Sequence, residues 1–213
     1  MIPSSLASSL EPVLIKQTDN RLGDINWFRT DWQRGGAATG FAKWQDEDNK
    51  VQEVVIKLPV VERELRWTRC MQNAKGVAPI LFASGSQLNG YDLAWMIIER
   101  FPVGPLGKHW EKTYIDRIAN AAARFTKSAS EFPVDQDGRR EDWDVLIKTA
   151  KKSVRENHIS NESKWKKAHS LLTKKLNSLL ERWRGRRIDQ WLHGDLHFAN
   201  AMCRAEGPDA KVS

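Results

Sequence analysis

Strand-type segments fill the first half of this sequence and helix-type segments fill the second, and this order constrains the fold more than any other feature. Residues 25–34 and Val51–Leu58 are rich in aromatic and β-branched side chains, and Phe41–Trp44 is an extended candidate between them. The small residues of Gly35–Gly40 and the polar residues of Asp46–Lys50 are turn signals. We therefore predict a three-stranded antiparallel meander.

A helix and two further strands are predicted next. Val61–Asn73 combines good helix formers with a charged face. Ile80–Ser84 and Ala94–Glu99 are strand candidates, and the Asn89-Gly90 pair between them is a turn signal.

Beyond these strands the pattern becomes helical. Ile115, Ile118, Ala122 and Phe125 recur at steps of three and four residues, which predicts one amphipathic helix face. A polar loop at 133–142 precedes a long helix with a continuous apolar stripe. The stripe consists of Trp165, Ala168, Leu172, Leu176, Leu179 and Trp183. Strands first and helices second favour an α+β fold with two lobes.

Three segments follow from this order: a lead-in at 1–19 that is loose or a short helix, a first lobe at 20–100 and a second lobe at 101–213. With 213 residues, 40% of them hydrophobic, the chain can bury a sizeable core. It contains no run of 18 apolar residues and no signal-peptide pattern, so we expect a cytoplasmic protein with no membrane partner. Cys70 and Cys203 lack metal-ligand spacing and are expected to be free thiols.

The net charge of +7 is concentrated in one segment. Between Lys148 and Arg187 there are 13 Lys or Arg residues and three Glu residues, a net charge of +10. Such a segment can attract nucleic acid, a membrane surface or an anionic substrate. The plainer interpretation, which we favour, is a solvated helix surface.

The segment His193–Asn200, with the sequence His-Gly-Asp-Leu-His-Phe-Ala-Asn, carries the clearest chemical signal. Asp195 lies two residues after His193, and Asn200 lies five residues after Asp195. These offsets are typical of kinase catalytic loops, in which the Asp accepts the proton of the substrate hydroxyl and the Asn binds magnesium. The motif therefore predicts phosphoryl transfer.

Lys57 ends the apolar run Val54-Val55-Ile56-Lys57, which is similar to the kinase strand whose lysine contacts the α- and β-phosphates. An enclosed ammonium needs an anionic partner, and Glu64 is the expected one, with Glu62 as the alternate. The plainer alternative is a lysine that reaches solvent at a strand end.

Three glycines, at positions 35, 36 and 40, are a second indication of phosphate binding. Gly35, Gly36 and Gly40 lie between the first two predicted strands, where backbone N–H groups can approach phosphate oxygens, with Thr39 as a further hydroxyl contact. A plain hairpin turn would show the same pattern.

With these motifs in place, the chain resembles the aminoglycoside phosphotransferase and choline kinase-like family, the small-molecule branch of the protein-kinase-like fold. Trp191–Asn200 is similar to the family's His-Gly-Asp-x-His-x-x-Asn signature. Val61–Glu64 and Met96–Arg100 are similar to its helix glutamate and its lobe-connecting hinge. The resemblance covers roughly residues 20–213.

The resemblance implies ATP and Mg²⁺ as cofactors and the hydroxyl of a small molecule as acceptor, without identifying that molecule. It implies that Asp195 is the catalytic base, Asn200 a magnesium ligand and Lys57 the phosphate contact, fixed by Glu64. The other implied roles are adenine contacts by backbone groups near Ile98 and Arg100, phosphate covering by Gly35, Gly36 and Gly40, and loop bracing by His193 and His197.

One departure from the family pattern affects activity. The segments 201–204 and 210–213 resemble the two arms of a hairpin that leads, in the family, to a second magnesium-binding Asp. Asp209 lies in the turn and is a poor substitute. We therefore expect that Asp beyond Ser213, little or no kinase turnover by these 213 residues alone, and association through apolar surface exposed by the truncation.

Two other classes of function are weighed against this one. His193, Asp195 and His197 alternate in one segment and are the ligand types of a metal hydrolase. The second alternative is a non-catalytic module that binds nucleotide, or nucleic acid through Lys148–Arg187.

Overall fold

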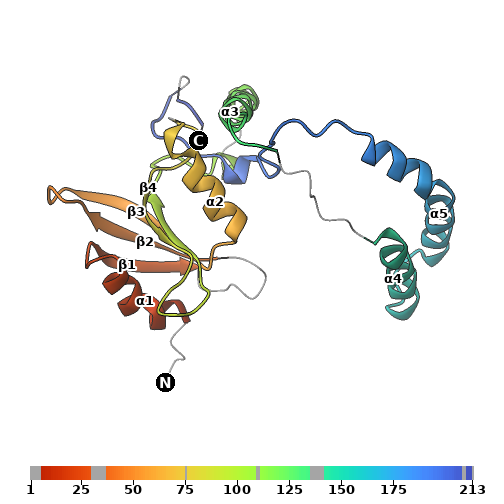
Figure 1. The fold of residues 1–213 in the computed structure, drawn as a ribbon, viewed down its shortest axis with the longest axis horizontal. Helices are drawn as coiled ribbons and strands as arrows, with labels where there is room; N and C mark the ends of the chain where they lie inside the picture. The colour runs from red at the N-terminus through yellow and green to blue at the C-terminus, as the bar shows by residue number, and fades with distance from the viewer. Residues whose placement is uncertain are drawn as a thin grey trace. The chain divides into compact units, whose positions relative to one another are not determined.

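The computed structural model describes residues 6–29, 37–74, 76–108, 111–134, 142–207 and 210–212. These residues form an α+β fold whose antiparallel sheet has the strand order β1-β2-β3-β5-β4 (Figure 1). The strands are β1 (Leu22–Arg29), β2 (Ala38–Gln45), β3 (Val51–Leu58), β4 (Leu81–Gly85) and β5 (Trp95–Glu99). The α-helices are α1 (Leu6–Gln17), α2 (Glu62–Cys70), α3 (Thr113–Ala129), α4 (Trp143–Glu156) and α5 (Glu162–Arg184). Short 3₁₀ helices span Met71–Asn73, Leu106–Lys108 and Phe198–Asn200.

The predicted meander is confirmed. β1 pairs antiparallel with β2, and β2 pairs with β3 in an unbroken register from Ala38 opposite Leu58 to Gln45 opposite Val51. The polar turn between β2 and β3 is closed by Asp46, whose Oδ1 accepts hydrogen bonds from the backbone N–H of two residues further along the turn. The first strand begins at residue 22 rather than 25, and residues 30–36, including Gly35 and Gly36, lie outside the described residues.

The prediction that Gly40 lies in the turn was wrong. Gly40 is an interior residue of β2, paired with Trp27 on β1 and Ile56 on β3. A Cβ at this position would lie 3.0 Å from Cε3 of Trp27 and 3.2 Å from the backbone oxygen of Asn26. Glycine here permits close approach of the tryptophan ring to the strand.

Alternation along the strands creates two cores, one on each face of the sheet. Val54, Ile56 and Leu58 are fully buried on one face, where they belong to the same cluster as Leu10 and Leu14 of α1. The N-terminal lead-in is thus a short helix that covers this face beside β1 (Figure 1). On the other face, Leu65 of α2 packs in a second cluster that contains the residues Val60, Met96 and Ile98, with Val55 against it.

The stripe that helix α3 buries shares Ile118 and Phe125 with the predicted one and differs from it at Ile115. Ile115 is 54% exposed, whereas Tyr114 and Phe125 are buried and Ile118 packs against the cluster around Tyr114. Tyr114 therefore takes the inward position that was predicted for Ile115, because a helix repeats every ~3.6 residues and the periodicity alone tolerates such a shift. The same cluster contains Leu106, Ala201, Cys203 and Val212.

The C-terminal segment meets the rest of the chain through two isolated bridges, Val103 with Cys203 and Cys203 with Val212. These bridges bring together the two arms that were predicted after Asn200. Burial raises the pKa of the Cys203 thiol, and Arg117 opposes this effect.

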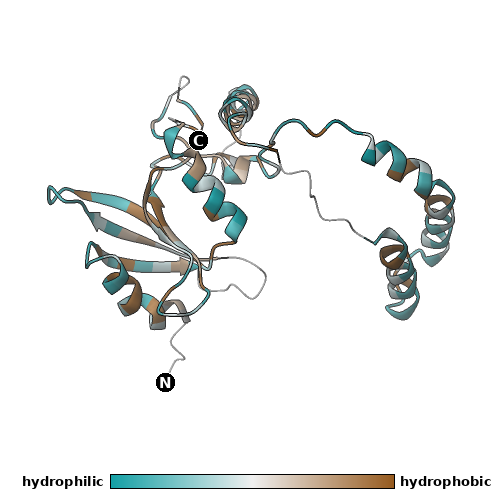
Figure 2. Cartoon of the chain, in the orientation of Figure 1, coloured by the Kyte–Doolittle hydropathy of each residue, from teal (hydrophilic) through white to brown (hydrophobic). Residues whose placement is uncertain are grey.

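Contacts between residues divide the chain into two compact units, residues 1–131 with 192–213, and residues 132–191. The second unit is a hairpin of α4 and α5, along which Figure 2 shows both hydrophobic and hydrophilic residues. The sequence predicted α5 but not a separate α4. Of the predicted α5 stripe, Leu176 is buried, whereas Trp165, Leu172, Leu179 and Trp183 are exposed. The lobe boundary at residue 100 stays a prediction. Across the described residues, no helix is long and apolar enough to cross a bilayer.

Candidate phosphotransfer site

Lys57 and Glu64 form an ion pair on the α2 face of the sheet. Strand alternation puts Lys57 on the same face as Val55, against which α2 packs. Its Nζ donates a hydrogen bond to Oε1 of Glu64 at 2.7 Å. The two side chains are 32% and 39% exposed, so the pair is partly shielded from water and open on one side. Of the two glutamates considered from the sequence, Glu64 is the one that the structure pairs with Lys57.

Asp195 and Asn200 are held together in the loop that precedes the last 3₁₀ helix. Nδ2 of Asn200 donates to the backbone oxygen of Asp195 at 3.1 Å and to its carboxylate Oδ2 at 2.9 Å. The amide nitrogen is thus turned toward the aspartate, and the same side chain carries an amide oxygen. Carboxylate and amide oxygens are the hard ligands that Mg²⁺ prefers, so these two residues fit that ion.

Both histidines of the motif form hydrogen bonds to the loop backbone. Nδ1 of His193 accepts from the N–H of Asp195 at 3.4 Å, and Nδ1 of His197 accepts from the N–H of Ala199 at 3.2 Å. Gly194 lies between the first two with φ of 79°, in the left-handed region that favours glycine. Burial lowers the pKa of the His193 imidazole, while the Asp195 carboxylate raises it and His197 lowers it further. A neutral imidazole is required for Nδ1 to accept a hydrogen bond.

An aromatic path connects the helix that carries Glu64 with the loop that carries Asp195. The rings of Trp67 on α2 and Phe125 on α3 are 5.7 Å apart, and Phe125 lies edge-on to His193 at 5.5 Å. Sequence periodicity identified Phe125 as a core residue, but no sequence signal indicated its contact with the loop.

The segment Met96–Arg100, for which adenine contacts are predicted, forms most of β5 and the residue after it. Ile98 is buried in β5 and paired with Val55 and Leu81. The backbone N–H of Arg100 donates to the backbone oxygen of Glu53 at 3.3 Å. Its guanidinium pairs with the Glu53 carboxylate and lies 3.9 Å over the Phe41 ring. The expected adenine contacts of this segment stay a prediction.

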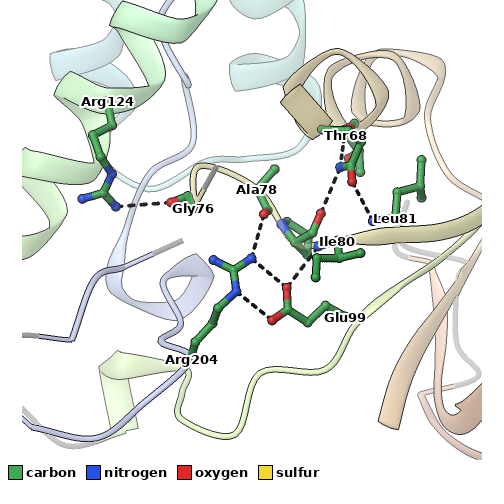
Figure 3. Close-up of polar contacts among 10 residues, drawn as sticks. Thr68, Gly76, Ala78, Ile80, Leu81, Glu99, Arg124 and Arg204 are labelled. Carbon is green, nitrogen blue, oxygen red and sulfur yellow. Dashed lines mark hydrogen bonds and ion pairs between the residues drawn. The ribbon is translucent and has the colours of Figure 1, made fainter. Parts of the chain in front are cut away.

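Sequence reasoning missed an ion pair between Glu99, at the end of β5, and Arg204, after the catalytic loop. Nε and Nη2 of Arg204 each lie 2.7 Å from a different carboxylate oxygen of Glu99 (Figure 3). Nη2 also donates to the backbone oxygen of Ala78, and Glu99 Oε2 accepts from the N–H of Ile80. The Glu99 side chain is only 17% exposed. This bidentate pair ties two segments 105 residues apart, a separation at which no local sequence pattern exists.

Replacing Arg204 with methionine is expected to lower the free energy of unfolding by about 1–2 kcal/mol, because a partly buried bidentate ion pair contributes more to stability than an exposed ion pair does. Urea denaturation measures the change. The matched control is Arg21→Met, which breaks the exposed pair with Glu47 and should cost less than about 1 kcal/mol. Equal costs for the two variants would contradict the special role of the Arg204 pair.

Residues 31–210 match the model of the phosphotransferase enzyme family, APH. The chain belongs to this family. The match begins just after β1 and extends beyond the His193–Asn200 motif, and the α+β fold agrees with the kinase-like fold of the family. No curated protein matches the chain.

The phosphotransferase thus has two pairs of predicted site residues in direct contact, Lys57 with Glu64 and Asp195 with Asn200. Gly40 lies in a strand beside Trp27, and the positions of the other two glycines are outside the described residues. Within the described ranges, no three His, Cys, Asp or Glu side chains gather into a metal-binding group. The metal hydrolase alternative therefore gains no support from the geometry.

Proposed function

We propose that this protein transfers the γ-phosphate of ATP to a hydroxyl group of a small molecule. The observation that carries the proposal is the Lys57–Glu64 pair, because a strand lysine held by a helix glutamate is the phosphate contact of kinase-like enzymes. Membership of the phosphotransferase family and the Asp195–Asn200 contact support it.

In this mechanism the protein acts through position and charge. The Lys57 ammonium would neutralise the α- and β-phosphates, and Glu64 would keep that ammonium in place. Asp195 would orient the acceptor hydroxyl and take its proton. The amide oxygen of Asn200 would hold Mg²⁺, which when bound supplies neutralisation of phosphate charge. His193 and His197 would brace the loop.

The expected location of the reaction follows from the cofactor and from the two cysteines. We place the reaction in the cytoplasm, where ATP is available and where free thiols such as Cys70 and Cys203 stay reduced.

Equilibrium binding of ATP, measured by calorimetry with and without Mg²⁺, tests this proposal. We expect saturable binding of one nucleotide, tighter with Mg²⁺ than without it. Asn200→Ala should remove the Mg²⁺ dependence and leave metal-free binding unchanged. The control Asn177→Ala alters an exposed asparagine of α5 and should change neither. Absence of ATP binding under both conditions would overturn the proposal, as would fast turnover that persists in Asp195→Asn.

A further inference from the structure

The basic segment Lys148–Arg187 forms most of α4 and α5, and some of its cations line a cavity between these helices. Four cations of α4 recur at steps of three and four residues and therefore share one helix face. They are Lys148, Lys151, Lys152 and Arg155. Glu162, Lys166 and His169 of α5 follow the same spacing and line the same cavity. Five of the 13 cations between Lys148 and Arg187 therefore line one cavity.

The cavity has a volume of about 220 Å³ and is lined by five Lys or Arg side chains and one Glu, together with Val154 and His169. The one carboxylate of the lining, Glu162, already forms an ion pair with Lys166 at 2.8 Å, and this pairing lowers the pKa of Glu162. Lys152 and Arg155 approach one further carboxylate, Glu156, at 4.0 and 3.8 Å. The lining thus has an excess of positive charge that a bound anion would neutralise.

His169 provides a second and independent observation. Both of its ring nitrogens are out of contact with solvent and have no hydrogen-bond partner among the described residues. Buried polar atoms are rarely left without a hydrogen-bond partner, because the lost hydration is not replaced, so the two unpaired ring nitrogens indicate that a partner is missing. His169 lines the cavity, and because its ring nitrogens lie out of contact with solvent, the ring has to rotate before an N–H can donate to an anion oxygen there.

We propose that this cavity between α4 and α5 binds the phosphate group of a small anionic ligand, with the α4 cations neutralising the charge and the His169 ring rotating to donate to a phosphate oxygen. Arg155 offers the forked donor geometry that suits phosphate, and the lysines act as point charges. The volume lies below the range of about 300–1,000 Å³ for drug-sized ligands, which favours a group the size of phosphate or pyrophosphate. Nucleic acid would instead use cations along an extended face.

This site is separate from the proposed phosphotransfer chemistry. All of its residues belong to the unit of residues 132–191, whereas Lys57, Glu64, Asp195 and Asn200 belong to the other unit. The two proposals can therefore succeed or fail independently.

The test is a titration of the 213-residue chain with three probes at fixed ionic strength: inorganic phosphate, pyrophosphate and methyl phosphate. The ring signals of His169, assigned with the variant His169→Gln, are followed by NMR. We expect a saturable shift of these signals with at least one probe, and the order of affinities separates free phosphate from an esterified phosphate group. Lys151→Gln and Arg155→Gln should each weaken binding by about 3- to 10-fold.

The matched control is the pair of single variants Lys174→Gln and Lys175→Gln, which remove the same charge from α5 outside the cavity lining. These variants should bind the probes as the unaltered chain does. Lys148→Gln provides a third cavity variant at an exposed helix position, and circular dichroism checks the helix content of each variant.

Three results would overturn the proposal. The first is no shift of the His169 signals with any probe. The second is equal weakening by cavity and control variants, which would indicate diffuse electrostatic attraction. The third is tight binding of a single-stranded oligonucleotide that depends on Lys174 and Lys175 as strongly as on Lys151, which would assign the basic surface to nucleic acid.

Discussion

Replacing Lys57 with methionine should weaken binding of ATP with Mg²⁺ by about 10- to 100-fold and leave the free energy of unfolding almost unchanged. A charged hydrogen bond to a phosphate contributes about 1.5–3 kcal/mol, and each ~1.4 kcal/mol changes affinity tenfold. Methionine keeps most of the lysine stem. The ion pair with Glu64 is about one-third exposed, so its loss should cost less than about 1 kcal/mol of stability.

Calorimetric titration with ATP and urea denaturation measure the two quantities separately. Lys50→Met is the matched control, because Lys50 is an exposed lysine next to the start of the same strand. Glu64→Gln should give an intermediate loss of affinity, since Lys57 keeps its charge but loses its anionic partner. Unchanged ATP affinity in Lys57→Met would remove the main support for the proposed nucleotide site.

Replacing Phe125 with alanine should produce the largest loss of stability among the variants considered. Phe125 is buried between Trp67 and His193, so its removal leaves a cavity at the junction of α2, α3 and the catalytic loop. Substitutions of this kind cost about 3–5 kcal/mol. At roughly 2–4 °C per kcal/mol for a chain of this size, the melting temperature should fall by about 6–20 °C.

Thermal unfolding followed by circular dichroism checks this expectation. Phe28→Ala is the control, because Phe28 is 55% exposed and its ring contacts that of Phe41 at 4.5 Å between centroids. It should cost about 0.5–1.5 kcal/mol, the range for an aromatic pair. The NMR signals of the His193 ring should change in Phe125→Ala and stay in place in Phe28→Ala. A smaller loss in Phe125→Ala than in the control would contradict the proposed junction.

Strand prediction succeeded where the local pattern and the tertiary environment agree. Val51–Leu58 was predicted with the bounds that the structure has, because its apolar side chains are buried on both faces of the sheet and Pro59 follows it. Gly40 was misplaced because glycine marks turns and also marks strand positions where another group comes close. The group in question is the Trp27 ring, and its approach depends on how β1 and β2 pair.

Helix prediction erred for related reasons. On α3 both Ile115 and Tyr114 fit an apolar stripe, and only the packing of Tyr114 against Leu106 and Ala201 selects the inward face. Helix α4 was missed although its sequence is amphipathic, and among the described residues of α4 and α5 only Val154 and Leu176 are buried.

The sequence by itself determined the local chemistry: the five-residue spacing brings Asp195 and Asn200 into contact within one loop, and the motif around them indicated the family. The tertiary structure alone decided which glutamate holds Lys57 and that Glu99 meets Arg204. The physical reason is separation along the chain. A contact within one loop follows from local geometry, whereas a contact across 105 residues forms only after the packing of the cores has compensated for the entropy of closing the chain.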